Sequence, residues 1–248
     1  MLLLGDIGNT ETKICLINSN KKIFKKIIFT SKNLSNLKLK KKIKLLKLKN
    51  INIEKCLFCS VVPKTFKKIK KHLKKFNNIN CLELKDLKIE KLIKIKANKK
   101  QVGSDRLANA IGVMNNKDNY IILDFGTATT FDVLINDVYH GGIIAPGIKL
   151  SLKTLVSNAS LIPNINLKKM KKVIGINTIT AVRSGFFWGY IGLIDNILNL
   201  IKKETRKTFK IIITGGFSYL FEKSIKNKTT INKDITIKGL IKSCSLIK

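Results

Sequence analysis

Two stretches of the sequence share one pattern and decide the fold. Residues 2–17 read LLLGDIGNTETKICLI, and residues 120–135 read YIILDFGTATTFDVLI. In each, an apolar run ends in an aspartate, Asp6 or Asp124, a glycine two residues further on permits a tight turn, and an alternating strand follows. The aspartates are 118 residues apart. The repeat predicts two similar α/β domains, one in each half of the chain.

The rest of the chain alternates expected strands and helices, which is typical of α/β proteins. We expect strands at residues 22–29, 56–62 and 211–214, helices at 33–48, 65–76, 104–116 and 178–201, a glycine-rich turn at 141–147 and a short closing element at 237–243. The polar stretch 115–119 is the best candidate for a boundary. The predicted domains are therefore residues 1–116 and 117–248.

Composition excludes several classes of protein. With 248 residues, 44% of them hydrophobic, the chain can bury a core and is not intrinsically disordered. No apolar run is long enough for a membrane span, and Asp6 comes too early for a signal peptide, so we expect a cytoplasmic protein with no membrane partner. Five irregularly spaced cysteines predict reduced, mostly buried thiols and no disulfide framework.

The charge of the chain is strongly positive. Lys and Arg number 49 against 15 Asp and Glu, a formal +34, which by itself suits a nucleic-acid partner. Only three of these residues are arginines, however, and the lysines are mixed with Ile and Asn throughout, as A/T-rich coding would produce. We interpret the basic blocks as solvated helix faces and expect no specific nucleic-acid partner.

The two hairpins supply what phosphate binding requires, namely backbone N–H groups at a glycine turn, hydroxyls, and a carboxylate that can anchor a metal. An ordinary hairpin also uses Gly and Asn, but two copies that each end a strand in Asp favour phosphate binding. Gly215-Gly216, after the expected strand at 211–214, would let a base or ribose approach the backbone. The candidate phosphate-binding residues of the first hairpin are Asp6, Ile7, Gly8, Asn9, Thr10, Glu11, Thr12 and Lys13.

A third motif, Gly103-Ser104-Asp105-Arg106, precedes an expected helix. Ser104 or Asp105 could cap that helix. Because arginine is rare in this chain, an Arg beside an Asp also indicates a guanidinium that binds a carboxylate or phosphate at two points. Both roles stay open.

Cysteines and histidines offer no metal site. Cys56 and Cys59 lie within one apolar strand, where residues three apart point to opposite faces, so core packing is expected. His72 and His140 have no partners at metal-ligand spacing and are interpreted as structural.

Taken in order, these motifs resemble those of the type III pantothenate kinases over essentially the whole chain. The resemblance rests on Asp6-Ile7-Gly8-Asn9-Thr10, Ser60-Val61-Val62-Pro63, Gly103-Ser104-Asp105-Arg106, Asp124-Phe125-Gly126-Thr127, Gly141-Gly142-Ile143-Ile144-Ala145-Pro146-Gly147, Asn177-Thr178 and Gly215-Gly216. It implies two ribonuclease H-like domains of the acetate and sugar kinase, heat-shock protein and actin superfamily, with the active site in the cleft between them. It also implies a homodimer that uses ATP, Mg²⁺ and K⁺ or NH₄⁺ to phosphorylate the 4′-hydroxyl of pantothenate, the first step of coenzyme A biosynthesis.

The same resemblance implies roles for single residues. Asp105 resembles the general base, and Gly103, Ser104 and Arg106 resemble pantothenate contacts. The remaining correspondences are Asp6 with a magnesium ligand, Thr127 with a nucleotide contact, Asp124 with a monovalent-cation ligand, and Thr178 with a substrate contact from the neighbouring subunit.

Two features leave alternatives open. Relatives commonly carry a tyrosine and an Asn-Pro pair before Gly103, whereas residues 95–99 here read IKANK. This difference leaves a kinase of another small hydroxylated acid as an alternative, and the +34 charge leaves a non-catalytic regulatory or nucleic-acid-binding relative as another. The expected helix at 178–201 carries an apolar stripe that could face a partner subunit or the core of its own chain, with Asn177 as its cap. That stripe is Val182, Phe186, Tyr190, Leu193, Ile194 and Ile197.

Overall fold

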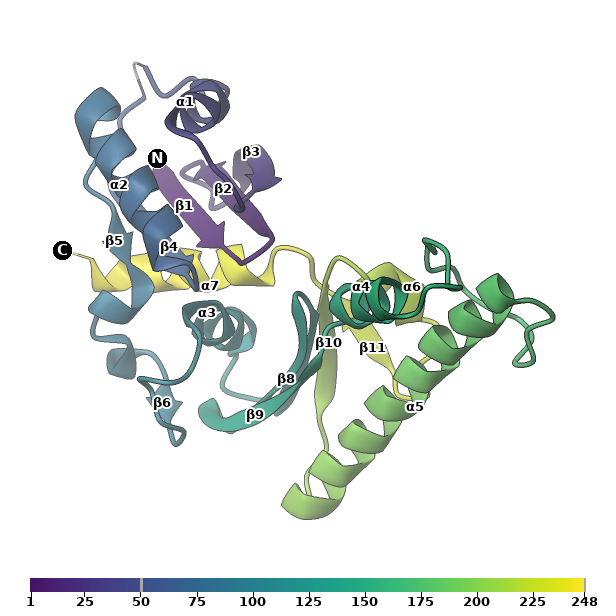
Figure 1. Cartoon of the computed structure of the whole chain (residues 1–248). Helices are drawn as coiled ribbons and strands as arrows, with labels where there is room; N and C mark the ends of the chain where they lie inside the picture. Colours follow the sequence, from purple (N-terminus) through teal and green to yellow (C-terminus); the bar gives the residue numbers. More distant parts are fainter. Residues whose placement is uncertain (50, 248) are drawn as a thin grey trace. The chain divides into compact units, whose positions relative to one another are not determined.

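The computed structural model describes residues 1–49 and 51–247. The chain forms two compact units. The first comprises residues 1–114 together with the segment that starts at Asp234, and the second comprises Asn115–Lys233. Figure 1 shows the elements of both units along the chain.

The first unit is built on a sheet with the strand order β3-β2-β1-β4-β5. Strands β1, β2 and β3 are antiparallel neighbours, and β4 and β5 continue the sheet in parallel. The strands of this sheet are β1 (Leu2–Ile7), β2 (Glu11–Ile17), β3 (Ile23–Thr30), β4 (Lys55–Ser60) and β5 (Leu82–Glu83), and the short strand β6 (Lys94–Ile95) is not part of it. The helices are α1 (Asn36–Lys44), α2 (Pro63–Asn77), α3 (Ser104–Val113) and α7 (Ile235–Ser243), with 3₁₀ turns η1 (Leu84–Asp86), η2 (Ile89–Lys91) and η3 (Cys244–Leu246).

One face of this sheet is covered by an amphipathic helix, α2. Pro63 is the first residue of the helix, a position whose backbone N–H would have no acceptor within the helix. Asn78 ends the helix in the left-handed conformation. Phe66, Ile69 and Leu73 recur at helical spacing and pack into the hydrophobic core of the first unit. The expected helix at 65–76 is therefore confirmed. Helix α1 is shorter than the expected 33–48.

The closing helix α7 belongs to the first unit, where it packs against α3. A Cβ on Gly239 would lie 1.8 Å from the carbonyl oxygen of Ala108, so only glycine permits this approach. The Thr236 hydroxyl also donates to Asn109 Oδ1 at 2.7 Å within the packed surface. The predicted domain 117–248 therefore differs from the observed second unit in its last residues. The segment from Asp234 onward belongs to the first unit because it packs against α3.

The second unit repeats the arrangement of the first. Strands β7, β8 and β9 are antiparallel neighbours, β10 lies parallel to β7, and β11 lies parallel to β10. The strands are β7 (Tyr120–Phe125), β8 (Ala128–Ile135), β9 (Val138–Pro146), β10 (Lys210–Gly215) and β11 (Thr229–Ile231), and the helices are α4 (Ile148–Asn158), α5 (Thr178–Thr205) and α6 (Ser218–Phe221). The predicted α/β fold with a duplicated sheet is confirmed.

The expected glycine-rich turn at 141–147 is wrong. Residues up to Pro146 belong to strand β9, and Gly147 precedes helix α4. Gly141 has φ +121° and lies opposite Val133, where the register of β8 and β9 shifts by a bulge. The glycine serves a bulge within a strand, and a bulge has the same glycine signal as a turn.

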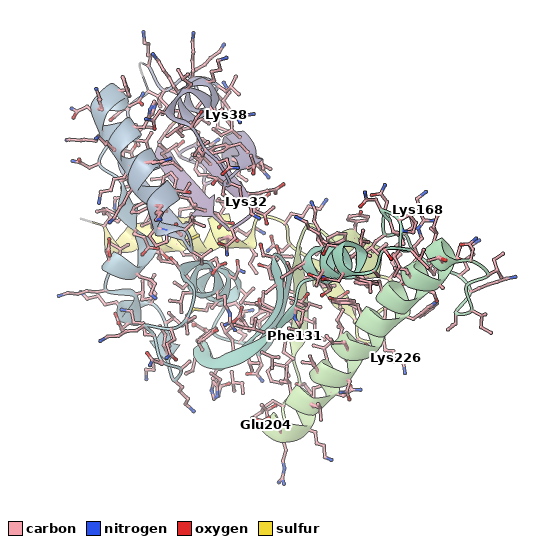
Figure 2. All side chains as sticks on the ribbon, in the orientation of Figure 1. Lys32, Lys38, Phe131, Lys168, Glu204 and Lys226 are labelled. Atoms are coloured by element: carbon pink, nitrogen blue, oxygen red, sulfur yellow. The ribbon has the colours of Figure 1, made fainter. Side chains whose placement is uncertain are left out.

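The lysines and the cysteines lie where the composition predicts, the lysines on the surface and the cysteines in the interior. Figure 2 shows lysine side chains along the chain, and Lys32, Lys38 and Lys168 are exposed. All five cysteines are free and buried, as predicted. Within the described residues, no helix combines the length and the apolar character that crossing a membrane requires.

Candidate active site

Asp6 lies near the end of strand β1 between two informative neighbours. In register it lies opposite Lys13 of β2 on one side and Cys59 of β4 on the other, so the three side chains share one face of the sheet. Cys59 Sγ donates to Asp6 Oδ1 at 3.6 Å. Lys13 Nζ lies 3.8 Å from the Asp234 carboxylate, just before α7. The sheet thus groups a carboxylate, a lysine ammonium group and a buried thiol on neighbouring strands.

Burial, and after it the negative charge of Asp105, raise the pKa of Asp6 to about 6, although Lys13 and the hydrogen bond from Cys59 lower it. Burial and the same two carboxylates hold the pKa of the Cys59 thiol well above its usual value. A carboxylate whose ionisation a neighbouring carboxylate makes more costly favours a bound cation or a shared proton. Cys59, predicted to serve core packing alone, is therefore also part of this site.

Asp105 lies in the first turn of α3 and folds back over Gly103. A Cβ on Gly103 would lie 2.5 Å from Asp105 Oδ1, so the glycine leaves room for the carboxylate. The Arg106 backbone N–H donates to Asp105 Oδ1 at 2.8 Å. Burial raises the pKa of Asp105, while the Arg106 N–H and the guanidinium charge oppose the rise. Gly103 itself occupies the N-cap position, so the expected cap by Ser104 or Asp105 is wrong.

Ser104 bonds within the protein. Its side chain is buried, and its hydroxyl donates to Glu83 at the end of β5. Glu83 was missed by the sequence reasoning. A single Glu in a two-residue strand has no motif around it, so no local signal distinguishes it.

The turn after β1 exposes its central residues and buries its flanks. The Gly8 N–H donates to the Glu11 carbonyl at 3.0 Å, and Asn9 and Thr10 are exposed. Ile7 packs into the core, and Thr12 Oγ1 lies 2.8 Å from Ser31 Oγ within the protein. Of the predicted phosphate-binding set, Ile7 and Thr12 can therefore contribute only backbone groups.

The corresponding edge of the second unit is shaped by a glycine. Asp124 lies opposite Thr130 and Thr214 at the ends of three strands. Gly215 has φ +87°, and a Cβ there would lie 2.6 Å from Asp124 Oδ1 and 2.5 Å from the Phe125 carbonyl oxygen. The missing side chain thus makes room for the Asp124 carboxylate. A Cβ on Gly216 would meet nothing within 4 Å, so Gly216 leaves open the space that a flat ligand would need.

Thr127 lies in the exposed turn between β7 and β8. A Cβ on Gly147 would lie 1.9 Å from the Thr127 carbonyl oxygen, so the start of α4 packs directly on this turn. Thr127 and Asp124 are thus held at the same end of β7.

Thr178 is the exposed first residue of α5. The predicted cap is confirmed, because Asn177 Oδ1 accepts the Thr180 N–H at 2.9 Å in a capping box. Ile194 of the predicted stripe is fully buried in the core of the second unit, and its other members are half-buried. The intrachain interpretation of α5 is therefore correct for its inner face.

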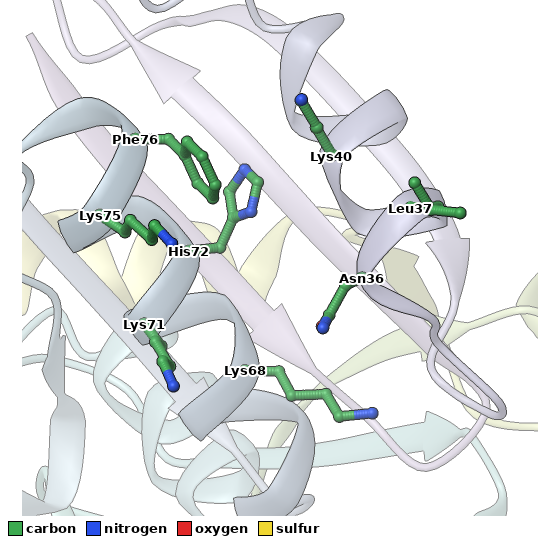
Figure 3. A pocket seen from close by; sticks show the side chains of 8 residues that line it. All are labelled: Asn36, Leu37, Lys40, Lys68, Lys71, His72, Lys75 and Phe76. Atoms are coloured by element: carbon green, nitrogen blue, oxygen red, sulfur yellow. The ribbon is translucent and has the colours of Figure 1, made fainter.

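A groove between α1 and α2, of about 470 Å³, contains none of the predicted site residues (Figure 3). His72 and Phe76 face each other there with ring centroids 4.7 Å apart. Burial and the charge of Lys40 lower the pKa of His72. The lining is Asn36, Leu37, Lys40, Lys68, Lys71, His72, Lys75 and Phe76. With four lysines and no carboxylate, this groove is not suited to a metal-dependent reaction.

Within the described part of the chain, no three His, Cys, Asp or Glu side chains converge as a metal cage. A magnesium ion at Asp6 would therefore take most of its ligands from water and substrate phosphates, which is how Mg²⁺ is commonly held. The acidic pair Asp6 and Asp105 fits that use.

Two units of one topology, each with an aspartate at the end of its first strand, define an α/β fold of the sugar-kinase type. A Sinorhizobium meliloti structure described as a 2-dehydro-3-deoxygalactonokinase has a TM-score of 0.60 at 10% identity, over 100% of this chain and 99% of that one. A Campylobacter jejuni structure described under the Baf family of transcriptional activators has a TM-score of 0.64 at 22% identity, over 98% of both chains. These two likenesses concern the fold alone.

The family follows from the sequence comparisons. The family model described as type III pantothenate kinase matches residues 2–200. A protein of Pelagibacter ubique with that name is 66% identical over the full length of both chains. The chain belongs to the type III pantothenate kinase family.

Proposed function

We propose that the protein transfers the γ-phosphoryl group of ATP to the 4′-hydroxyl of pantothenate in the cytoplasm, as the first step of coenzyme A biosynthesis. Family membership supports the substrate. The observation that carries the chemistry is the half-buried Asp105 carboxylate in the first turn of α3, close enough to Asp6 to raise its pKa. A phosphoryl-transfer site needs an anchor for the phosphates and a proton acceptor for the alcohol.

The residues divide the work. The backbone of the Gly8–Thr10 turn and Lys13 bind phosphate oxygens, and Arg106 binds the pantothenate carboxylate at two points. Asp105 accepts the hydroxyl proton, and its raised pKa makes it a better acceptor near neutrality. Asp6 would hold a magnesium ion, which when bound would neutralise charge on the phosphates.

Asp124 is proposed as the ligand of a monovalent cation, K⁺ or NH₄⁺. The carboxylate is half-buried beside Gly215, and close to phosphates it would repel them unless a cation neutralised it. Thr127, at the same end of β7, and the open side of Gly216 are proposed as nucleotide contacts.

A second copy of the chain is proposed as the partner of α5. Gly185, Gly189 and Gly192 recur on one face of this helix, and a Cβ added at any of them would meet nothing within 4 Å. Three mid-helix glycines cost about 1 kcal/mol each, which a close approach of another helix would justify. Ile174 and Ile176, just before α5, are 84% and 91% exposed, so the partner would also cover apolar surface.

The dimer is tested by mixing inactive variants. Asp105→Asn and Thr178→Phe should each be nearly inactive alone. If Thr178 acts in the partner's site, random one-to-one exchange should restore about a quarter of wild-type activity, because one of the two sites in each heterodimer is intact. No recovery after verified exchange would mean that each chain builds its own site.

The function is tested by ADP release with and without pantothenate. We expect release to depend on pantothenate. Stimulation by another hydroxylated acid and not by pantothenate would favour the second candidate function, a kinase of another small hydroxylated acid. The 95–99 stretch, which has neither Tyr nor Pro, supports that candidate.

A further inference from the structure

Glu83 joins three segments of the first unit. Its Oε1 accepts the Ser60 backbone N–H at 3.3 Å and also the Ser104 hydroxyl. Its Oε2 accepts the Lys85 N–H at 2.6 Å. Ser60 ends β4, and Ser104 starts α3. One carboxylate therefore holds the end of a central strand and the start of the helix that carries Asp105.

Lys85, two residues on, holds the segment that leads into this helix. Its Nζ donates to the carbonyls of Lys100 and Val102 at 3.0 and 3.1 Å. Glu83 and Lys85, here called the η1 clamp, thus bind both sides of Gly103. This segment follows residues 95–99, which lack proline, so its conformation depends on such contacts rather than on a fixed φ.

The clamp acts where the site needs restraint. Ser60 lies beside Ile7 in the β1–β4 register, next to the pairing of Asp6 with Cys59. Helix α3 contacts strand β4, which lies next to β1 in the sheet, and the carboxylates of Asp105 and Asp6 would repel each other as like charges if nothing held α3 in place. Glu83 links the strand beside Asp6 to the residue before Asp105.

We infer that Glu83 is a positioning residue for phosphoryl transfer, which sets the separation of the Asp6 and Asp105 carboxylates through Ser104. It does not touch substrate. This inference rests on the proposed function for its kinetic consequence, but its structural consequence can be measured without any substrate.

The kinetic test is a double-mutant cycle. Glu83→Gln leaves one acceptor oxygen in place of two, so either the Lys85 or the Ser60 N–H must face an amide NH₂. Ser104→Ala removes only the bond to α3. Each should lower kcat about 10-fold or more, with the KM for ATP near wild type, because a misplacement of about 1 Å at a reacting group is costly. The double variant should lose no more than Glu83→Gln alone.

The matched control is Glu90→Gln. Glu90 lies in the neighbouring turn η2, is exposed and pairs with Lys99, so its kcat should stay near wild type. Additive losses in kcat for Glu83→Gln and Ser104→Ala would contradict the inference. So would equal losses in kcat and ATP affinity that accompany a lowered melting temperature, because Glu83 would then be only a structural residue.

A second measurement is independent of substrate. The Leu107 N–H donates to the Gly103 carbonyl in the first turn of α3. Its hydrogen exchange should accelerate about 10-fold in Glu83→Gln, with amides of α2 unchanged. If the wild-type protein does not act on pantothenate, the proposed function is wrong. The hydrogen exchange at Leu107 still shows whether Glu83 positions the start of α3. Unchanged exchange at Leu107 would overturn the inference.

Discussion

The hairpins β1–β2 and β7–β8 have the same topology and the same placement of an aspartate, yet their surroundings differ. Asp6 lies between Lys13 and Cys59, close to a second carboxylate from α3. Asp124 lies between two threonines and beside Gly215, whose missing side chain leaves room for the Asp124 carboxylate. The comparison shows that each copy of the sheet places an aspartate at the end of its first strand. The residues packed beside that strand end then determine the chemical environment of the aspartate.

The largest effect should come from the helix that distinguishes the first hairpin. Asp105→Asn removes the proposed proton acceptor and should lower kcat about 10²-fold or more, with ATP binding nearly intact. Single-turnover kinetics and nucleotide titration measure the two separately. Thr130→Val, a change beside Asp124 in the second hairpin, is the comparison and should cost less. Near wild-type turnover of Asp105→Asn would contradict the assignment of the base.

The second hairpin should respond to cations. Activity should rise with K⁺ or NH₄⁺ and hardly with Na⁺, and Asp124→Asn should abolish that dependence while sparing the fold. Rates measured at constant ionic strength in the three salts test this. Equal wild-type rates in sodium and potassium would remove the functional contrast between the two hairpins.

The cost in stability should differ between the glycine in the turn of the first hairpin, Gly8, and the glycine beside Asp124 of the second, Gly215. Gly215→Ala forces a side chain into a positive-φ position and against the Phe125 carbonyl, and should lower the free energy of unfolding by about 1–3 kcal/mol. Gly8→Ala meets only the Glu11 carbonyl at 3.2 Å and should cost less. Gly216→Ala, which meets nothing, is the control. Urea unfolding gives all three values, and equal costs would contradict the packing argument.

The smallest effect should come from the basic groove. Lys71→Gln combined with Lys75→Gln should leave kcat and KM near wild type, because no predicted site residue lines that groove. Binding to duplex DNA should be weak, fall steeply with salt and show no sequence preference. Sequence-selective binding at physiological salt that the double variant loses would assign the groove a function.

Much of the fold was predictable because its signals are local. Apolar runs that end in Asp and turn at Gly identified both hairpins, helical spacing identified α2, and Asn177 identified the start of α5. The glycines at 141–147 were misinterpreted, since a bulge and a turn require the same backbone freedom. Glu83 and Asp234 were missed because each acts on residues distant in sequence, Ser104 and Lys13.

The sequence alone determined the duplicated α/β pattern, the family and the residues that carry the proposed chemistry, because periodicity and motifs are properties of neighbours along the chain. Only the tertiary structure decided that α7 returns to the first unit, that Asp6 and Asp105 share one environment, and that Ile7 and Thr12 face the core. All three features depend on residues that are distant in sequence and close in space. Burial and a neighbouring like charge raise the pKa of Asp6, and the missing Cβ of Gly239 lets α7 approach α3.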